Sequence, residues 1–127
     1  MTGEGLGTAL LVAAAGGLGA TARFAVDGAA RARWTTAFPW STVAINVTGS
    51  LLLGLLTGLL TADGAPGLVR TVLGAGFCGG YTTFSTASVE TVRLLRLRRY
   101  AAAAGNAVGS LVLTVAAGGL GLWLGSR

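Results

Sequence analysis

The chain has 127 residues, of which 53% are hydrophobic and only 10% are charged, and its formal net charge is +5. A soluble domain of this length carries about 25% charged residues, so the composition indicates an integral membrane protein. The absence of histidine and the single cysteine exclude histidine-based catalysis, metal cages of histidine and cysteine, and internal disulfides.

Four apolar segments are long enough to cross a membrane, which takes about 20 mostly apolar residues. They cover residues 5–24, 42–61, 68–89 and 100–124, and the loops between them are short. The sequence therefore predicts a single all-α membrane domain, 1–127, with four transmembrane helices. The first segment begins without basic residues, so we expect a retained helix and not a cleaved signal peptide.

The third segment contains the stretch 74–88, which is too rich in glycine and hydroxyl groups for an ordinary membrane helix. Irregular backbone within a bilayer is tolerated only where protein buries it or where it lines a wet cavity. The glycine pair Gly79-Gly80, followed by Thr82-Thr83, therefore predicts a broken third helix that holds or passes something.

The basic residues are all arginines, and they gather on one side of the predicted topology. The first loop and its edge carry Arg23, Arg31 and Arg33, the third loop carries Arg93, Arg96, Arg98 and Arg99, and the opposite side has Arg70 and Arg127. Basic loops stay in the cytoplasm. We therefore expect a multi-pass protein of the cell membrane with both termini outside the cytoplasm, and no nucleic-acid binding.

The second and fourth segments each carry a row of small and polar residues. Asn46 lies in the second, and Asn106, Ser110 and Thr114 follow each other at i, i+4 and i+8 in the fourth, which aligns them on one side of a helix. Such residues bond and pack neighbouring membrane helices. We therefore expect the glycines of these rows to pack helices. Polar groups in lipid are also costly and often functional, so both helix packing and pore lining fit Asn46 and the Asn106-Ser110-Thr114 row.

Other polar or glycine-rich features have simpler interpretations. The stretch 17–22 matches a dinucleotide fingerprint but has no strand before it, so we expect close helix packing there. Cys78 is expected to be a small buried hydrophobe, and Asp27 to pair with Arg23 at i, i+4. Glu90 closes the third segment, either as a solvated helix end or as a charge at a pore mouth.

The membrane interior offers little chemistry. No carboxylate, histidine or lysine lies in mid-span, and hydroxyls without a base are weak nucleophiles, so we expect no enzyme. The same gap argues against a proton-coupled transporter and against a small multidrug-type exporter. Amides, hydroxyls, electropositive ring edges and freed carbonyls remain. They indicate a passive conduit for a small uncharged or anionic species, with a bound cation as an option, or a non-conducting membrane scaffold.

Over nearly its whole length the chain resembles the CrcB/Fluc family of fluoride channels. Four motifs in order carry the resemblance: Gly16-Gly17-Leu18-Gly19-Ala20 with Arg23-Phe24; Phe38-Pro39-Trp40-Ser41-Thr42 leading to Asn46 and Gly49-Ser50; Gly76 to Thr86 with Glu90; and Ser110. The order and spacing of all four make the resemblance specific, whereas any one alone is weak.

The resemblance implies an antiparallel, dual-topology-type dimer with two fluoride pores, which exports fluoride passively and lowers its cytoplasmic level. It also implies a structural, non-transported Na⁺ at the dimer centre, held by the backbone carbonyls of Gly79 and Thr82. On the family motif, Asn46, Phe84, Ser110 and Thr114 match the fluoride path, and Arg23, Gly80 and Thr83 match structural positions.

One position departs from the family pattern. The motif continues as Ser-Thr-Phe in the family and as Ser85-Thr86-Ala87 here, so the second pore phenylalanine is missing. Each family pore takes its two phenylalanines from different subunits. Together with the arginine bias, this favours a heterodimer with a homologous subunit over a homodimer. The alternatives are a homodimer that tolerates Ala87 and a non-conducting partner subunit.

Overall fold

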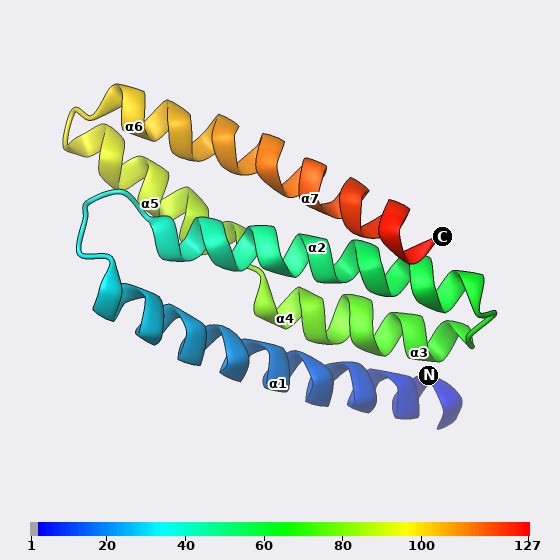
Figure 1. Ribbon diagram of the computed structural model, residues 1–127. Coiled ribbons are helices and arrows are strands. Elements are labelled where there is room, and N and C mark those ends of the chain that lie inside the picture. The colour runs from blue at the N-terminus through cyan, green and yellow to red at the C-terminus, as the bar shows by residue number, and fades with distance from the viewer. Residues whose placement is uncertain (1–2) are drawn as a thin grey trace.

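The computed structural model describes residues 3–127, and within that range every element is a helix (Figure 1). Three long helical runs are α1 (Gly3–Arg33), α2 (Trp40–Ala62), and α6 (Tyr100–Ala104) with η2 (Gly105–Gly109) and α7 (Ser110–Gly125). A fourth, interrupted run comprises α3 (Gly67–Thr71), η1 (Val72–Cys78), α4 (Gly79–Tyr81) and α5 (Phe84–Arg96). The turns η1 and η2 have π-helical hydrogen bonding.

Three of these runs are long and apolar enough to cross a membrane: Gly3–Arg33, Trp40–Ala62 and Tyr100–Gly125. The chain is thus a multi-pass membrane protein. The predicted second and fourth segments agree with the structure to within about two residues at each end. The predicted third segment is interrupted at Thr82–Thr83, as expected, and each of its two halves is shorter than a membrane span.

The predicted first membrane segment, 5–24, lies within α1, which continues to Arg33. The residues after Arg23 are rich in alanine and include few helix breakers, and a helix can run on where its apolar stretch stops. Arg23 is therefore a mid-helix residue and does not belong with the loop arginines.

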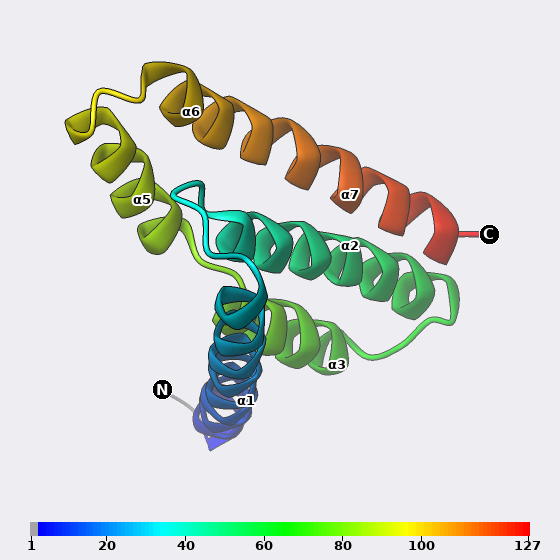
Figure 2. The same ribbon diagram turned by 60° about the vertical axis from the view of Figure 1, so that its left-hand side comes forward.

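The helices form an elongated bundle with α2 in the middle (Figure 1). The run from α3 to α4 and helix α1 lie on one side of α2, and α7 lies on the other. The α1–α2 and α5–α6 connections are at one end of the bundle, and both termini are at the opposite end in that view. Figure 2 shows that α2 and α7 are closest near the C-terminus and diverge toward α6, with α5 beside the opening.

Glycines bring two helix pairs into backbone contact. Between α2 and α7, a Cβ on Gly54 would overlap the carbonyl oxygen of Gly118, and one on Gly121 would overlap that of Leu51. We call this contact the glycine seam; its glycines are Gly54, Gly58, Gly118, Gly121 and Gly125. Between α1 and the third run, Gly19 abuts the Phe77 carbonyl and Gly80 abuts that of Gly16. The close packing predicted for the stretch 17–22 is confirmed.

Candidate functional site

The interruption in the third run is a two-residue extended segment between α4 and α5. Thr82 has φ −82° and ψ 161°, and Thr83 has φ −148° and ψ 119°. The Thr82 amide and hydroxyl both donate to the Cys78 carbonyl, at 3.0 and 2.9 Å, which closes α4. The Thr83 hydroxyl oxygen accepts from the Thr86 amide at 3.2 Å and caps the start of α5. The break thus consists of one helix end and one helix start, each closed by a threonine.

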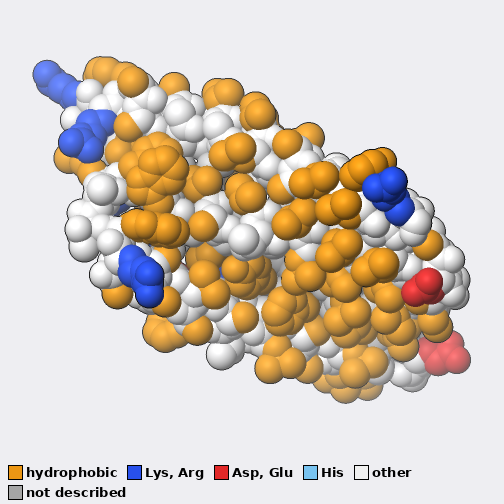
Figure 3. All heavy atoms as spheres, viewed as in Figure 1, with side chains coloured by type: hydrophobic (Ala, Val, Ile, Leu, Met, Phe, Trp, Pro, Cys, Tyr) orange, Lys and Arg blue, Asp and Glu red, His pale blue; other side chains and the backbone are white. Residues whose placement is uncertain are grey.

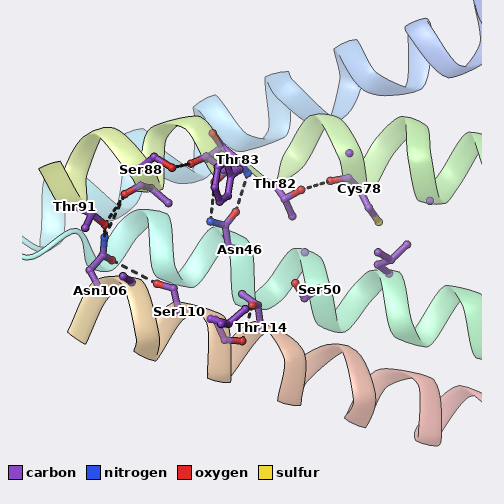
Figure 4. Close-up of a pocket in the computed structure, with 18 of the residues that line it drawn as sticks. Asn46, Ser50, Cys78, Thr82, Thr83, Ser88, Thr91, Asn106, Ser110 and Thr114 are labelled. Atoms are coloured by element: carbon purple, nitrogen blue, oxygen red, sulfur yellow. Dashed lines mark hydrogen bonds between the residues drawn. The ribbon is translucent and has the colours of Figure 1, made fainter. Parts of the chain in front are cut away.

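Asn46 on α2 bonds directly to the backbone of this break. Its Nδ2 donates to the Thr83 carbonyl at 2.9 Å, and its Oδ1 accepts from the Thr83 amide at 2.8 Å (Figure 4). In a continuous helix the Thr83 amide would bond to the Gly79 carbonyl four residues earlier. The pair of bonds therefore stabilises the extended segment and leaves the Gly79 carbonyl without its normal helical donor.

Arg23 approaches the same break from α1. Its Nε donates to the Gly80 carbonyl at 3.3 Å, and the side chain is half-buried. The expected pairing of Asp27 with Arg23 is wrong: Asp27 accepts from Arg31 at 2.9 Å and from the Ser41 hydroxyl at 2.5 Å. Because Arg23 donates to a carbonyl at the end of α4, it satisfies one of the acceptors that a helix end exposes.

A groove of about 730 Å³ runs beside the break between α2, α5 and α7, and we call it the polar groove (Figure 4). It brings together most of the site residues predicted from the sequence: Asn46, Gly79, Thr82, Thr83, Phe84, Ser110 and Thr114. The other two, Arg23 and Gly80, do not line it. Phe84 is 87% exposed, so in this chain its ring is free to contact another molecule.

Asn106 is a buried member of this site that the sequence placed in the polar row but not in the fluoride path. It is 1% exposed; its Nδ2 donates to Thr91 Oγ1 at 2.8 Å and lies 3.4 Å from the Ala87 carbonyl. Its Oδ1 accepts from the Ser110 hydroxyl at 3.4 Å. The i, i+4 spacing of Asn106 and Ser110 signalled the contact between them, whereas nothing in the local sequence signalled Thr91.

Glu90 is buried, at 6% exposed, so its interpretation as a solvated helix end is wrong. Its Oε1 accepts from the Thr42 hydroxyl at 2.5 Å and lies 3.6 Å from Arg31 Nη2. Its Oε2 is buried without a hydrogen-bond partner among the described residues. Arg31 can reach Glu90 on α5 because α1 is long enough to carry it that far along the bundle. Glu90 does not line the polar groove.

The family described as CrcB-like protein, Camphor Resistance (CrcB), matches residues 10–123. Fluoride-specific ion channel FluC 1 of Leifsonia xyli subsp. xyli is 57% identical over 116 residues, which cover 91% of this chain and 85% of that protein. Fluoride-specific ion channel FluC 2 of Cutibacterium acnes is 48% identical over 121 residues, covering 94% and 98%. Fluoride-specific ion channel FluC 1 of Streptomyces avermitilis is 44% identical over 114 residues, covering 90% and 92%.

Proposed function

The chain belongs to the CrcB family, and we propose that it is a subunit of a fluoride-specific channel that exports fluoride passively across the cell membrane. The observation that carries the proposal is the polar groove. It places an asparagine amide, several hydroxyls and one exposed aromatic ring along a single path between apolar helices, and no acidic side chain lines it among the described residues. These are groups that can accept an anion without repelling it.

The groove can replace part of the hydration shell that an anion loses on entering a membrane. Ser88, Ser110 and Thr114 place hydroxyls along its length, each of which would turn from its acceptor within the chain to donate to the anion. The edge of the Phe84 ring is electropositive. No titrating group is needed, since an inside-negative potential favours anion exit by about 2.3 kcal/mol per charge per 100 mV. The mechanism is therefore diffusion down the electrochemical gradient.

The exposure of Phe84 supports an assembly of two subunits. A ring 87% exposed beside an open groove is suited to contact with a second chain, and we propose an antiparallel dimer with two fluoride pores. At Ala87, which also lines the groove, this chain has a methyl group where the family motif has a second ring. A heterodimer with a homologous subunit that supplies the missing ring is thus favoured over a homodimer.

The break supports a structural sodium ion, and its donor chemistry fits one. The Thr83 amide bonds to Asn46 and not to the Gly79 carbonyl, and the Thr82 carbonyl belongs to an extended residue. Hard cations prefer oxygen ligands such as backbone carbonyls. Gly79 and Thr82 would hold Na⁺ with these two oxygens from each subunit, and the ion would offset the partial negative charge of the carbonyls.

The arginine distribution supports a fixed orientation. Arg31, Arg33, Arg93, Arg96, Arg98 and Arg99 belong to the end of the bundle with the α1–α2 and α5–α6 connections. Arg70 and Arg127 belong to the other end. We propose that the arginine-rich end is cytoplasmic and that both termini are outside. A subunit inserted in one orientation needs a partner inserted in the other to form an antiparallel pair.

The test is fluoride efflux from liposomes, measured with a fluoride electrode. Vesicles contain this chain alone, or this chain with a homologous subunit of opposite arginine bias and an intact Ser-Thr-Phe motif, and chloride efflux is the control. We expect rapid fluoride efflux from the pair, at least tenfold slower efflux from the single chain, and no chloride efflux. Equal rates for the single chain and the pair would refute the heterodimer. No fluoride flux from either would refute the channel and favour a non-conducting scaffold.

A further inference from the structure

We propose that the arginine-rich end of the chain carries a binding site for an anionic phospholipid, with the acyl chain in an apolar groove and the phosphate against arginines. The groove has a volume of about 450 Å³ and shares no lining residue with the polar groove. It is lined by Trp34, Thr36, Trp40, Val43, Ala44, Val47 and Leu113. We call it the tryptophan groove.

The shape of the tryptophan groove follows from the packing of α2 and α7. The glycine seam holds these helices in backbone contact near the C-terminus, and they diverge toward the arginine-rich end (Figure 2). From Trp40 to Val47 the groove extends over seven residues of helix, about 10 Å at 1.5 Å per residue. Its walls within that depth are aliphatic. A space of this depth with these aliphatic walls suits a hydrocarbon chain. The Thr36 hydroxyl, in the loop before α2, donates to the Phe38 carbonyl at 3.3 Å.

Two tryptophans form the rim of the groove. Trp34 and Trp40 are each 50% exposed, and Trp40 packs on Phe38 with ring centroids 4.6 Å apart. Tryptophan concentrates at the membrane–water interface, where its ring lies at the level of lipid headgroups. The rim thus marks the depth at which a phosphate would lie, with the aliphatic walls extending from there into the hydrocarbon.

Unpaired positive charge surrounds this rim. Arg33 directly precedes Trp34. Arg93 Nη2 donates at 3.2 Å to the carbonyl of Ala37, which lies in the loop between α1 and α2. Arg96 ends α5, and Arg98 and Arg99 lie on the α5–α6 connection at the same end of the bundle. Within residues 3–127, Arg31 alone forms ion pairs, with Asp27 and Glu90. Figure 3 shows blue side chains beside large hydrophobic side chains at this end, and both blue and red side chains at the other.

The arginines and the apolar groove together favour an anionic phospholipid as the ligand. Clusters of four to eight basic residues next to a membrane helix attract anionic lipids, and the guanidinium group binds phosphate oxygens through paired hydrogen bonds. A free phosphate would use the arginines and leave the apolar groove empty, and a zwitterionic lipid would gain little from the positive charge. The inference needs only the membrane location of the chain and does not depend on which ion it conducts.

Native mass spectrometry of the purified protein in detergent tests the site, with phosphatidylglycerol and phosphatidylcholine as probes. The variant Arg33→Gln/Arg96→Gln removes two arginines that form no ion pair within the described residues. Arg70→Gln/Arg127→Gln removes the same charge from the other end of the bundle.

Ala44→Phe and, separately, Val47→Phe fill the tryptophan groove. Thermal unfolding of each variant identifies any that is misfolded, and the second filling variant serves if the first is unstable.

We expect the wild type to retain phosphatidylglycerol more tightly than phosphatidylcholine. Arg33→Gln/Arg96→Gln should weaken this retention by about 25-fold, at roughly fivefold per arginine, and the groove-filling variants should weaken it as well. The far-end variant should retain the lipid as the wild type does. Equal weakening by both double variants would reduce the effect to non-specific charge and overturn the site. Unchanged retention in a folded groove-filling variant would also overturn it, because the acyl chain would then lie elsewhere.

Discussion

The glycine seam and the break in the third run are both rich in small residues, but they are held together in different ways. In the seam, α2 and α7 meet backbone to backbone, and a Cβ on Gly54 or Gly121 would overlap a carbonyl of the other helix. At the break, the backbone leaves the helix and is held by side chains, with Asn46 on Thr83 and Arg23 on Gly80. The seam depends on shape alone, whereas the break depends on directional hydrogen bonds.

Because the two regions are held together differently, substitutions in the seam should affect folding, and substitutions at the break should affect conduction. A contact made by shape tolerates no added volume, so substitutions in the seam should act on folding. A contact made by hydrogen bonds leaves unpaired polar groups when a partner is removed, so substitutions at the break should change the polar groove while the bundle persists. The four predictions below test this separation.

The largest expected effect is that of Gly54→Ala in the glycine seam. The new methyl group would overlap the Gly118 carbonyl and lie 2.8 Å from the Leu122 amide nitrogen. Since both are backbone atoms, α7 must move away, and we expect a loss of about 3 kcal/mol or more, at the upper end of overpacking costs. Thermal unfolding in detergent measures it. The control is Gly119→Ala, where nothing lies within 4 Å of a Cβ; equal unfolding temperatures for the two variants would contradict the account.

The sequence predicted the seam in outline, because small residues in membrane segments commonly mark helix contacts. It predicted the break as well, since Gly79-Gly80 and the threonines that follow are poor choices for a continuous helix in lipid. It could not predict what holds the break. The bonds from Asn46 to Thr83 join residues 37 positions apart, and local periodicity carries no information on such a pairing.

The second prediction concerns Asn46→Leu at the break. Leucine has the same branching and number of side-chain heavy atoms, although its methyl groups are larger. It leaves the Thr83 amide and carbonyl without partners, at about 1–3 kcal/mol for each buried group. We expect the extended segment to shift and fluoride efflux to fall at least tenfold, while gel filtration still shows an assembled protein. Asn46→Gln is the conservative comparison and should retain part of the flux. Wild-type efflux from Asn46→Leu would show that this side chain supports neither the break nor the path.

The third prediction concerns Phe84→Ile in the polar groove. Phe84 is 87% exposed in the single chain, so its substitution should change the unfolding temperature little. Isoleucine lacks the electropositive ring edge, so fluoride efflux from the assembled channel should drop several-fold. The matched control is Phe24→Ile, an 82% exposed phenylalanine on α1 that does not line the polar groove. If both variants slow efflux equally, the ring edge of Phe84 has no special role.

Sequence reasoning misjudged the partner of Asp27 and the exposure of Glu90, both toward the arginine-rich end. The predicted first membrane segment ended near residue 24, where the apolar stretch stops. Because α1 continues to Arg33, Arg23 faces the break instead of a loop, and Arg31 reaches both Asp27 and Glu90. The partners of Asp27 and Glu90 are instead set by how α1, α2 and α5 meet, with Ser41 and Thr42 on α2 donating to the two carboxylates. Charge pairs between helices depend on how far each helix extends, which apolar length alone does not determine.

The smallest expected effect is that of Asp27→Asn, a third kind of contact that depends neither on shape nor on the break. Asp27 accepts from Arg31 at i, i+4, and the two side chains are 34% and 51% exposed. Exposed pairs of this spacing contribute about 0.3–0.5 kcal/mol and are screened by salt. Asparagine keeps an acceptor for the Ser41 hydroxyl, so we expect a small decrease in unfolding temperature that disappears in high salt, with fluoride efflux unchanged. A large, salt-independent decrease would mean that the Asp27–Arg31–Glu90 cluster behaves as a buried network. In that case the arginine-rich end would contribute to stability on the scale of the glycine seam, and the division into seam and break would have to include it.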